Sequence, residues 1–394
     1  MTPQEDELRE LRRALDARSG EVSPEFRARL SSALAEGRPT SNFLPALAAV
    51  AAVLLVFATV GVLLLARQSR NEPPPGSAIP TATLTPDSIP GVLTKPPGRI
   101  PMPSSAELSA ASANVIWTIV DFRYLYRSTD RGTAWEQRPV PAASKYFGPD
   151  ISFVSDTEGW FSVSGEPTGE CKSESIAIWH TTDAGATWQP LGSNGIAGAQ
   201  CKQGLSFVDS KRGFLDAWDP NHAAVIYRTT DGGRTWAASK PLPTPPGFKT
   251  VCTGCIGMQS GLVRAFGSTL LVPVWPQSGT GTGAQYVFRS DDGGATWAYA
   301  ASAPEQDGKV VFVTASRWLK LIGPTQSTET TDAGATWHRY TSDYSQAAPV
   351  AANFLFADPY VGYGTVRGGI TRTTDGGLHW TAIETPGTGM KACC

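Results

Sequence analysis

The alternation of apolar and polar residues predicts short strands from about residue 104 to the end of the chain. ISFVSDTEGWFSVSG (151–165), LSFVDSKRGFLDAWD (205–219) and FLFADPYVGYGTVRGG (354–369) each hold an apolar strand, a polar turn, and a glycine–aromatic pair that opens another strand. VVFVTASRWLKLIG (310–323) is a weaker copy without glycine before its tryptophan. Many short strands separated by repeated turns predict an all-β fold.

An eight-residue pattern, which we call the octet, recurs six times among these segments. The copies are STDRGTAW (128–135), TTDAGATW (181–188), TTDGGRTW (229–236), SDDGGATW (290–297), TTDAGATW (330–337) and TTDGGLHW (373–380). The Asp can accept hydrogen bonds from backbone N–H groups of its own turn, the Gly adopts a backbone angle that other residues resist, and the Trp offers a large apolar face. The octet therefore predicts a hairpin with a structural role, carried by Asp130, Gly132, Trp135, Asp183, Gly185, Trp188, Asp231, Gly233, Trp236, Asp292, Gly294, Trp297, Asp332, Gly334, Trp337, Asp375, Gly377 and Trp380.

The spacing of the octets predicts the architecture. Their Asp residues lie 40 to 61 positions apart, which is the length of a four-stranded propeller blade with variable loops. Six octets predict a six-bladed β-propeller over residues 104–394. A seven-bladed ring is the alternative, because the long interval from Asp231 to Asp292 has room for a degenerate blade.

A different pattern precedes the propeller. Residues 43–66 are 24 uncharged residues rich in Ala, Val and Leu, and at about 1.5 Å per residue they form a helix long enough to cross a hydrocarbon core of about 30 Å. Residues 1–42 carry apolar residues at helical spacing and predict a short helical arm, either a docking arm for a cytoplasmic partner or a solvated helix pair. Residues 67–103 predict a Pro- and Thr-rich linker. Arginines lean towards the N-terminal side of the span, which favours a single-pass plasma-membrane protein with a cytoplasmic N-terminus and an extracytoplasmic propeller.

The composition argues against nucleic-acid binding. The formal net charge is −2 and only 17% of residues are charged, so there is no basic excess to bind nucleic acid. Glycine (40), proline (31) and tryptophan (12) are abundant, as expected of a β protein with many turns and repeated aromatic wedges.

The octet, together with F-V-D-x-x-x-G-aromatic, resembles the Asp-box (BNR-repeat) propellers, and among them the photosystem II assembly and stability factor-like propellers. It is similar more loosely to sialidases, sortilin ectodomains and xyloglucan-active propeller glycosidases. The resemblance covers roughly residues 105–385. It implies that each octet closes the hairpin between the third and fourth strands of a blade, away from the mouth of any active site. It also implies a role in building a membrane complex.

A sialidase site would need three arginines for the substrate carboxylate, a Tyr–Glu pair and an acid. Gly98-Arg99-Ile100-Pro101 is one residue away from the F-R-I-P motif of that family. Arg99 nevertheless lies in the Pro-rich linker, and most other arginines lie beside the octets, so we interpret the match as coincidental.

A pair of carboxylates for glycoside hydrolysis is the second enzymatic option. The candidates are Asp156, Glu158, Asp209, Asp216, Asp219, Asp307 and Asp358. Asp156, Asp209 and Asp358 occupy equivalent turns, so repetition explains them as turn formers. Asp216 and Asp219, near Trp218 and His222, have no counterpart in other repeats and are the candidate ligand residues.

The histidines show no metal-binding spacing, and we expect neither a metal nor another cofactor. Six cysteines fit an oxidising compartment, where Cys171 with Cys201 and Cys252 with Cys255 are our expected disulfides. A zinc site made by Cys252, Cys255, Cys393 and Cys394 is the alternative, although adjacent cysteines chelate poorly.

These observations favour binding over catalysis. We expect a membrane-anchored scaffold or assembly factor whose protein or glycan ligand sits at the propeller mouth, where the loops of all blades converge. Loops around 171–176, 216–222 and 277–285 are not repeated and are the expected determinants of specificity. A glycoside hydrolase of the sialidase or xyloglucanase type is the alternative.

Overall fold

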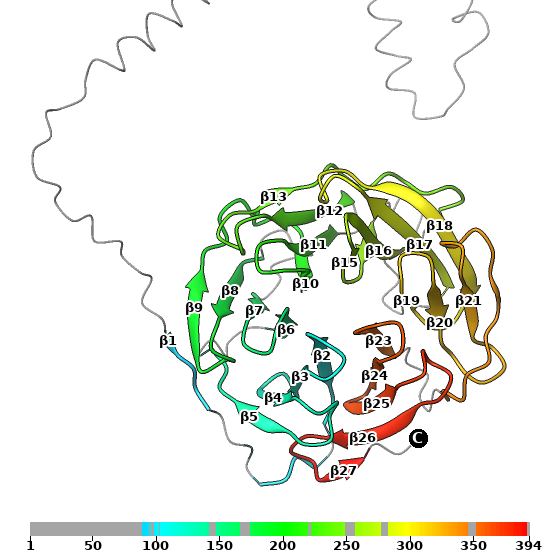
Figure 1. Ribbon diagram of the computed structural model, residues 1–394. Helices are drawn as coiled ribbons and strands as arrows, with labels where there is room; N and C mark the ends of the chain where they lie inside the picture. Colours follow the sequence, from blue (N-terminus) through cyan, green and yellow to red (C-terminus); the bar gives the residue numbers. More distant parts are fainter. Residues whose placement is uncertain are drawn as a thin grey trace, which may run out of the picture. The chain divides into compact units, whose positions relative to one another are not determined.

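Six antiparallel sheets form a ring in the computed structural model (Figure 1). The structure describes residues 89–93, 96, 98–101, 103–141, 147–165, 174–219, 222–248, 257–276, 283–345 and 352–391. These residues form strands and turns without any helix, so within them no helix is long and apolar enough to cross a bilayer. The predicted helical arm and the predicted span at 43–66 lie outside the described residues.

Each of the six sheets is a blade built from consecutive strands. Blade 1 holds β2 (Ala106–Ala110), β3 (Ile116–Val120), β4 (Tyr124–Ser128) and β5 (Glu136–Arg138). Blade 2 holds β6 (Phe147–Phe153), β7 (Gly159–Ser164), β8 (Ile176–Thr181) and β9 (Thr187–Leu191). Blade 3 holds β10 (Cys201–Phe207), β11 (Gly213–Asp219), β12 (His222–Thr229) and β13 (Ala237–Ala238).

The second half of the chain continues this order. Blade 4 holds β14 (Met258–Ser260), β15 (Arg264–Phe266), β16 (Thr269–Pro276), β17 (Gly283–Ser290) and β18 (Ala298–Gln306). Blade 5 holds β19 (Val310–Phe312), β20 (Trp318–Lys320), β21 (Thr328–Thr330) and β22 (His338–Arg339). Blade 6 holds β23 (Asn353–Phe356), β24 (Gly362–Val366), β25 (Gly369–Thr373), β26 (Thr381–Thr385) and β27 (Met390–Lys391).

The ring has six blades, so the seven-bladed alternative is set aside. β14 and β15 both pair with β16, so they are two pieces of one inner strand. The long interval between the octets at Asp231 and Asp292 therefore holds one blade with a divided inner strand and long outer strands.

Every octet closes the hairpin between the third and fourth strands of its blade, as predicted. In blade 3 the Asp231 carboxylate accepts hydrogen bonds from the backbone N–H groups of Arg234 and Thr235, both at 3.0 Å. The Thr229 hydroxyl donates to Asp231 at 2.8 Å and accepts from the N–H of Gly233 at 2.9 Å. Gly233 has a φ of 93°, which a residue with a Cβ resists. The conserved spacing of the octet follows from this network.

The glycine of each glycine–aromatic pair makes room for a phenylalanine of the preceding strand. A Cβ on Gly159, Gly213 or Gly362 would lie 2.2 to 2.7 Å from the ring of Phe153, Phe207 or Phe356. In blade 2 the aromatic residue that follows stacks on the phenylalanine of the next blade: Trp160 lies 3.7 Å from Phe207, centroid to centroid, at 3°. This strand–turn–strand segment therefore contributes to the contact between blades 2 and 3.

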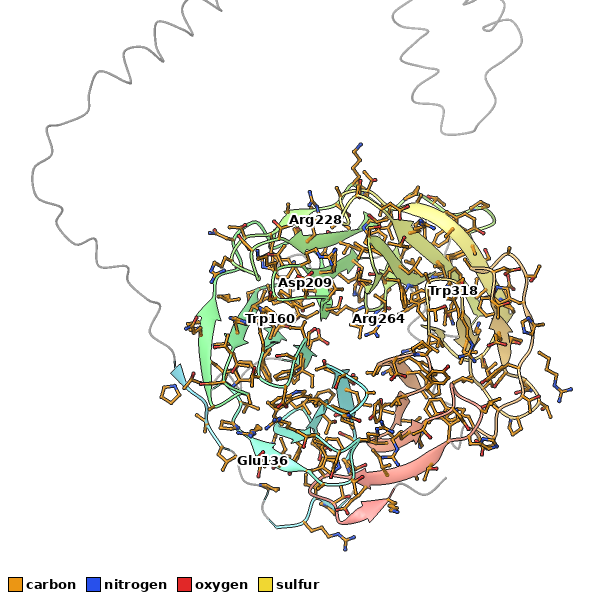
Figure 2. All side chains as sticks on the ribbon, viewed as in Figure 1. Glu136, Trp160, Asp209, Arg228, Arg264 and Trp318 are labelled. Atoms are coloured by element: carbon orange, nitrogen blue, oxygen red, sulfur yellow. The ribbon has the colours of Figure 1, made fainter. Side chains whose placement is uncertain are left out.

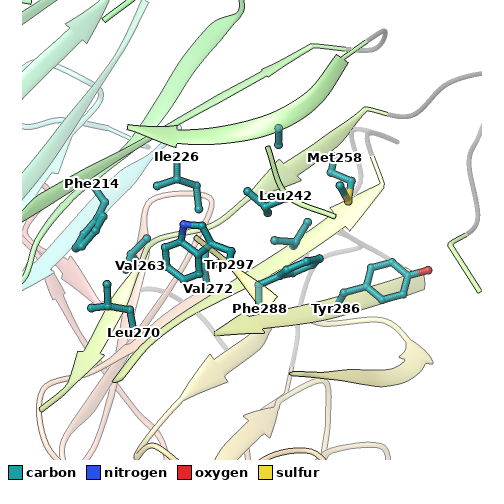
Figure 3. Packing of buried hydrophobic residues seen from close by; sticks show 12 residues of the cluster. Phe214, Ile226, Leu242, Met258, Val263, Leu270, Val272, Tyr286, Phe288 and Trp297 are labelled. Atoms are coloured by element: carbon teal, nitrogen blue, oxygen red, sulfur yellow. The ribbon is translucent and has the colours of Figure 1, made fainter. Parts of the chain in front are cut away.

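The hydrophobic core is divided among the seams between blades. Figure 3 shows the seam between blades 3 and 4, where Phe214 and Ile226 of blade 3 meet Val263, Leu270 and Trp297 of blade 4. At roughly 25 cal/mol per Å² of buried apolar surface, such seams supply most of the attraction between neighbouring blades.

The segment before blade 1 joins three blades. β1 (Ile89–Pro90) pairs with β9 on the outer edge of blade 2. Ile100 is buried beside Tyr126 of blade 1, and its N–H donates to Gly387 of blade 6 at 2.9 Å. The described residues between 89 and 101, part of the predicted linker, therefore pack on the propeller, and we call them the strap.

Candidate functional site

The innermost strands of five blades each place one residue at an equivalent position near the axis of the ring. The equivalence follows from a shared hydrogen bond at the first turn of five blades: the N–H of residue 111, 154, 208, 313 or 357 donates to a carbonyl four residues on. Counting back four positions from each donor gives Glu107, Asp150, Gly204, Lys309 and Asn353. We call these residues the axial set.

The axial set lies towards the end of the ring opposite the octets. Octet residues hydrogen-bond to the first turn of their own blade, as the N–H of Gly232 does to the Lys211 carbonyl at 2.9 Å. The inner strands therefore end on the octet side and begin on the other side. Asn353 is the first residue of its inner strand, Glu107 is the second residue of its strand, and Lys309 directly precedes its strand. These residues therefore lie at the end of the ring where the mouth of the propeller is expected.

Several polar side chains here fasten one inner strand to the next. Hydroxyls of Ser109, Ser152 and Ser206 accept from the backbone N–H of the following blade at 2.7 to 3.2 Å. Asp150 does the same, since its Oδ2 accepts from the N–H of Gly204 at 2.9 Å. An inner strand is the edge of its sheet, so these bonds satisfy backbone groups that would otherwise stay unpaired.

Asp150 is a carboxyl group in an unfavourable place for a charge. Burial, and after it the nearby Glu107 carboxylate, raise the pKa of Asp150 to about 7, although backbone N–H groups of Leu205 and Gly204 act in the opposite direction. A neutral, hydrogen-bonded carboxyl near physiological pH is consistent with a structural role and also with proton donation.

Glu107 and Lys309 face the axis from blades 1 and 5. Burial raises the pKa of Glu107 and lowers the pKa of Lys309, and each charge partly offsets the shift of the other. Lys309 donates to Asn353 of blade 6 at 2.7 Å. Both side chains remain partly exposed, so an incoming group can reach them.

Arg264 of blade 4 lies outside the axial set, towards the octet end of the ring, because Phe356, its partner, is the last residue of the inner strand β23. Its guanidinium donates to the carbonyl of Phe356 in blade 6, two blades away, and Figure 2 shows Arg264 near the middle of the ring. Burial lowers the pKa of Arg264, and no carboxylate among the described residues pairs with it. Arg264 supplies a single guanidinium, whereas a sialidase site would need three arginines to bind the substrate carboxylate.

The candidate ligand residues lie on strands of blade 3. Asp216 is 2% exposed between blades 3 and 4, accepts from the N–H of Ser260 at 3.3 Å, and has its pKa raised to about 7 by burial. Trp218 is half-buried opposite Cys201 in the β10–β11 pairing. The backbones of Asp219 and His222 are opposite each other at the adjoining ends of β11 and β12. The structure therefore brings these residues together on one blade, with Asp216 enclosed.

The other carboxylate candidates are held by neighbouring side chains or by their own turns. Asp156 pairs with Arg127 and Glu158 with His180, the latter at 3.1 Å. Asp209 and Asp358 accept backbone N–H groups of their turns at 2.7 to 2.9 Å, which agrees with the turn-forming role expected for them. Asp307 lines a hollow beside blade 5.

Arg99, of the sequence that resembles F-R-I-P, donates to carbonyl groups of Thr388 and Gly389. It therefore belongs to the strap. Cys201 is disulfide-bonded, and the pairing with Cys171 stays a prediction because Cys171, like the other four cysteines, lies outside the described residues. No cluster of three or more His, Cys, Asp and Glu side chains able to hold a metal occurs in the part of the chain that the structure describes.

Sequence reasoning missed Glu107, Asp150, Arg264 and Lys309. The turns and glycines of the repeat were visible, but the charged residues vary from blade to blade and so leave no repeated motif. The usable signal was positional: three residues before the Phe of the inner strand, the repeat carries Asp150, Gly204, Lys309 and Asn353 in turn.

No family model matches the chain. The xyloglucanase Xgh74A of Acetivibrio thermocellus is 27% identical over 195 residues, which cover 44% of this chain and 22% of that protein. A xyloglucanase of a Paenibacillus species is 27% identical over 330 residues, covering 66% of this chain and 30% of that protein. The chain thus spans less than a third of the length of these curated relatives.

Among solved structures, YCF48 from Cyanidioschyzon merolae is 17% identical with a TM-score of 0.44, covering 75% of this chain and 89% of that one. YCF48 bound to D1 peptide is 16% identical with a TM-score of 0.44, covering 75% and 86%. The Hadza microbial sialidase Hz136 is 12% identical with a TM-score of 0.46, covering 72% and 66%. At these identities the similarity is one of fold. The chain is a six-bladed β-propeller with such proteins among its structural neighbours.

Proposed function

We propose that this chain is a membrane-anchored scaffold whose extracytoplasmic propeller holds a protein or a surface polymer at the end remote from the octets. The partly exposed Glu107 and Lys309 offer both charges to a ligand at that end. The uncharged run at 43–66 and the predicted disulfides support the anchor and the oxidising compartment.

The observation that carries binding over hydrolysis is the engagement of Asp150. Hydrolysis of a glycosidic bond needs two carboxyl groups free to act on the substrate. Of the two axial acids, Asp150 is tied to the backbone of blade 3, and Glu107 alone has no hydrogen-bond partner among the described residues.

A glycoside hydrolase is the second candidate. The two xyloglucanases support it through sequence similarity, and the raised pKa of Asp150 beside Glu107 suits a general acid. In that case Asp150 would have to release the N–H of Gly204 to reach a substrate.

Two measurements on the full-length protein separate the candidates. Incubation with xyloglucan and with a fluorogenic sialoside should release no product. Proximity labelling in native membranes should give a set of neighbours that is lost in the Glu107→Gln, Lys309→Met double variant and kept in Glu384→Gln, an exposed acid of the outer rim. Product release that disappears in Asp150→Asn would establish the hydrolase, and an unchanged set of neighbours in the double variant would reject the axial site.

A further inference from the structure

The outer edge of blade 4 differs from the outer edges of its neighbours. β18 runs for nine residues, Ala298–Gln306, whereas β13 and β22, the outer strands of blades 3 and 5, have two residues each. Figure 1 shows β18 as a long strand on the rim of the ring. β18 is the last strand in the order of its sheet, so half of its backbone N–H and C=O groups point away from β17.

The stretch from Ala298 to Ala303 has one of the usual features that block a sheet edge, a bulge at Ala300, where the register with β17 shifts between Val287 and Phe288, but it lacks the others. Its sequence, AYAASA, carries no charge, and Ala298, Ala300 and Ser302 are exposed. Its outward backbone groups hydrogen-bond to nothing in the described ranges. Natural edge strands are normally short, charged or covered. Pro304 and Glu305 end this open stretch.

Two other blades of the same ring have their outer edge covered by a fifth strand. β1 pairs with β9 through Ile89↔Trp188 and Pro90↔Thr187, and β27 pairs with β26 through Glu384↔Lys391 and Thr385↔Met390. Both covering strands are short extended pieces of polypeptide. The rim of this propeller therefore accepts a fifth strand, and blade 4 offers the longest edge for one.

A hollow of about 630 Å³ opens where β18 ends. It lies between β18 and the outer part of blade 5, and its lining includes Gln306, Asp307, Thr328, Trp337, His338 and Arg339. The lining mixes hydrogen-bonding groups of both charges with one aromatic residue. A polar side chain is the kind of group that such a lining would hold.

We propose that β18 binds an extended polypeptide segment of a partner protein as a fifth strand of blade 4. The backbone of Ala298 to Ala303 supplies the hydrogen bonds, and the hollow takes one polar side chain of the segment. In this mode of recognition, backbone bonds give affinity and side-chain pockets give specificity. The site lies on the rim, so it is separate from the axial set.

The test uses the full-length protein and a fluorescein-labelled heptapeptide of alternating threonine and valine. Binding is followed by fluorescence anisotropy, and the contact is located by hydrogen exchange. We expect binding that slows amide exchange in Ala298–Ala303. Peptide with alternate N-methylated amides should bind at least about tenfold more weakly, because the hydrogen bonds to the edge are lost.

Two matched variants check the position. Ala300→Lys places a charged side chain on the open edge, and Ala237→Lys places it on the short outer strand of blade 3, where Ala237 is also exposed. We expect roughly tenfold weaker binding in Ala300→Lys only, with an unchanged melting temperature. No binding, binding that survives N-methylation, or protection away from β18 would overturn the proposal. Self-association that Ala300→Lys abolishes, without peptide binding, would assign the edge to a second copy instead and would equally overturn it.

Discussion

Replacing Asp231 by alanine removes the carboxylate at the centre of one octet. That carboxylate accepts four hydrogen bonds: two from the backbone N–H groups of Arg234 and Thr235, and two from the hydroxyls of Thr229, at 2.8 Å, and Thr235, at 2.6 Å. In the variant all four donors lose their partner at once. The hairpin between β12 and β13, and with it the position of Trp236, then depends on the remaining contacts.

The size of the effect follows from the exposure of these donors. Each net hydrogen bond contributes about 0.5–1.5 kcal/mol, and bonds to a charged group contribute more. Arg234 and Thr235 are exposed, so water replaces part of what their N–H groups lose. We therefore expect Asp231→Ala to lower the free energy of unfolding by about 1–3 kcal/mol, which is less than four intact bonds would suggest.

The assay is urea denaturation followed by tryptophan fluorescence, with Thr230→Ala as the matched control. Thr230 lies in the same octet, is exposed, and makes no side-chain hydrogen bond in the described part of the chain. Thr230→Ala should leave the midpoint unchanged, while Asp231→Ala should lower it at constant slope. Equal midpoints for the two variants would refute the reasoning. Loss of ligand affinity in Asp231→Ala without loss of stability would place the ligand on the octets.

Three further outcomes are expected. Gly213→Ala should destabilise by about 1–3 kcal/mol because its Cβ would lie 2.5 Å from the ring of Phe207, whereas Gly192→Ala, with its nearest neighbour at 3.9 Å, should be neutral in the same urea titration. The pKa of Asp216 is about 7 in the folded protein, against an ordinary 3.8, so the stabilisation from this carboxyl group is fully present below about pH 4 and is lost as pH rises through 7. Asp216→Asn should flatten the resulting slope of unfolding free energy against pH, and an equal slope in both proteins would contradict the assignment. Cys201 should resist thiol labelling until a reductant is added, and six free thiols in native protein would contradict both the disulfides and the exported topology.

The octets could be predicted from sequence because their structure is local. All the bonds of Asp231 run to residues within four positions, so a fixed spacing is enough to show them. The blade count was predicted for the same reason. The alternative arose only where the inner strand of blade 4 divides into β14 and β15, a break that the interval between octets does not reveal.

The axial set could not be predicted because it depends on contacts between blades. Asp150 meets Gly204 across 54 positions, and Arg264, which is not in the set but also lies near the axis, meets Phe356 across 92. Asp216 shows the opposite error: its lack of a repeat counterpart suggested an open loop, whereas its carboxylate accepts the N–H of Ser260 between two blades. A residue that departs from a repeat can therefore mark a seam between blades as well as a ligand-binding surface.

The strap determines how the ring responds to mechanical load. Each blade is made of consecutive strands, so no strand is shared between the first and the last blade, and the seam there relies on contacts such as Tyr363 to Ala113, at 3.1 Å. A pull on the chain ahead of residue 89 first shears β1 from β9. Only then does the force reach Arg99 and Ile100, which hydrogen-bond to blade 6. We therefore expect blade 2 to take the force before the seam does.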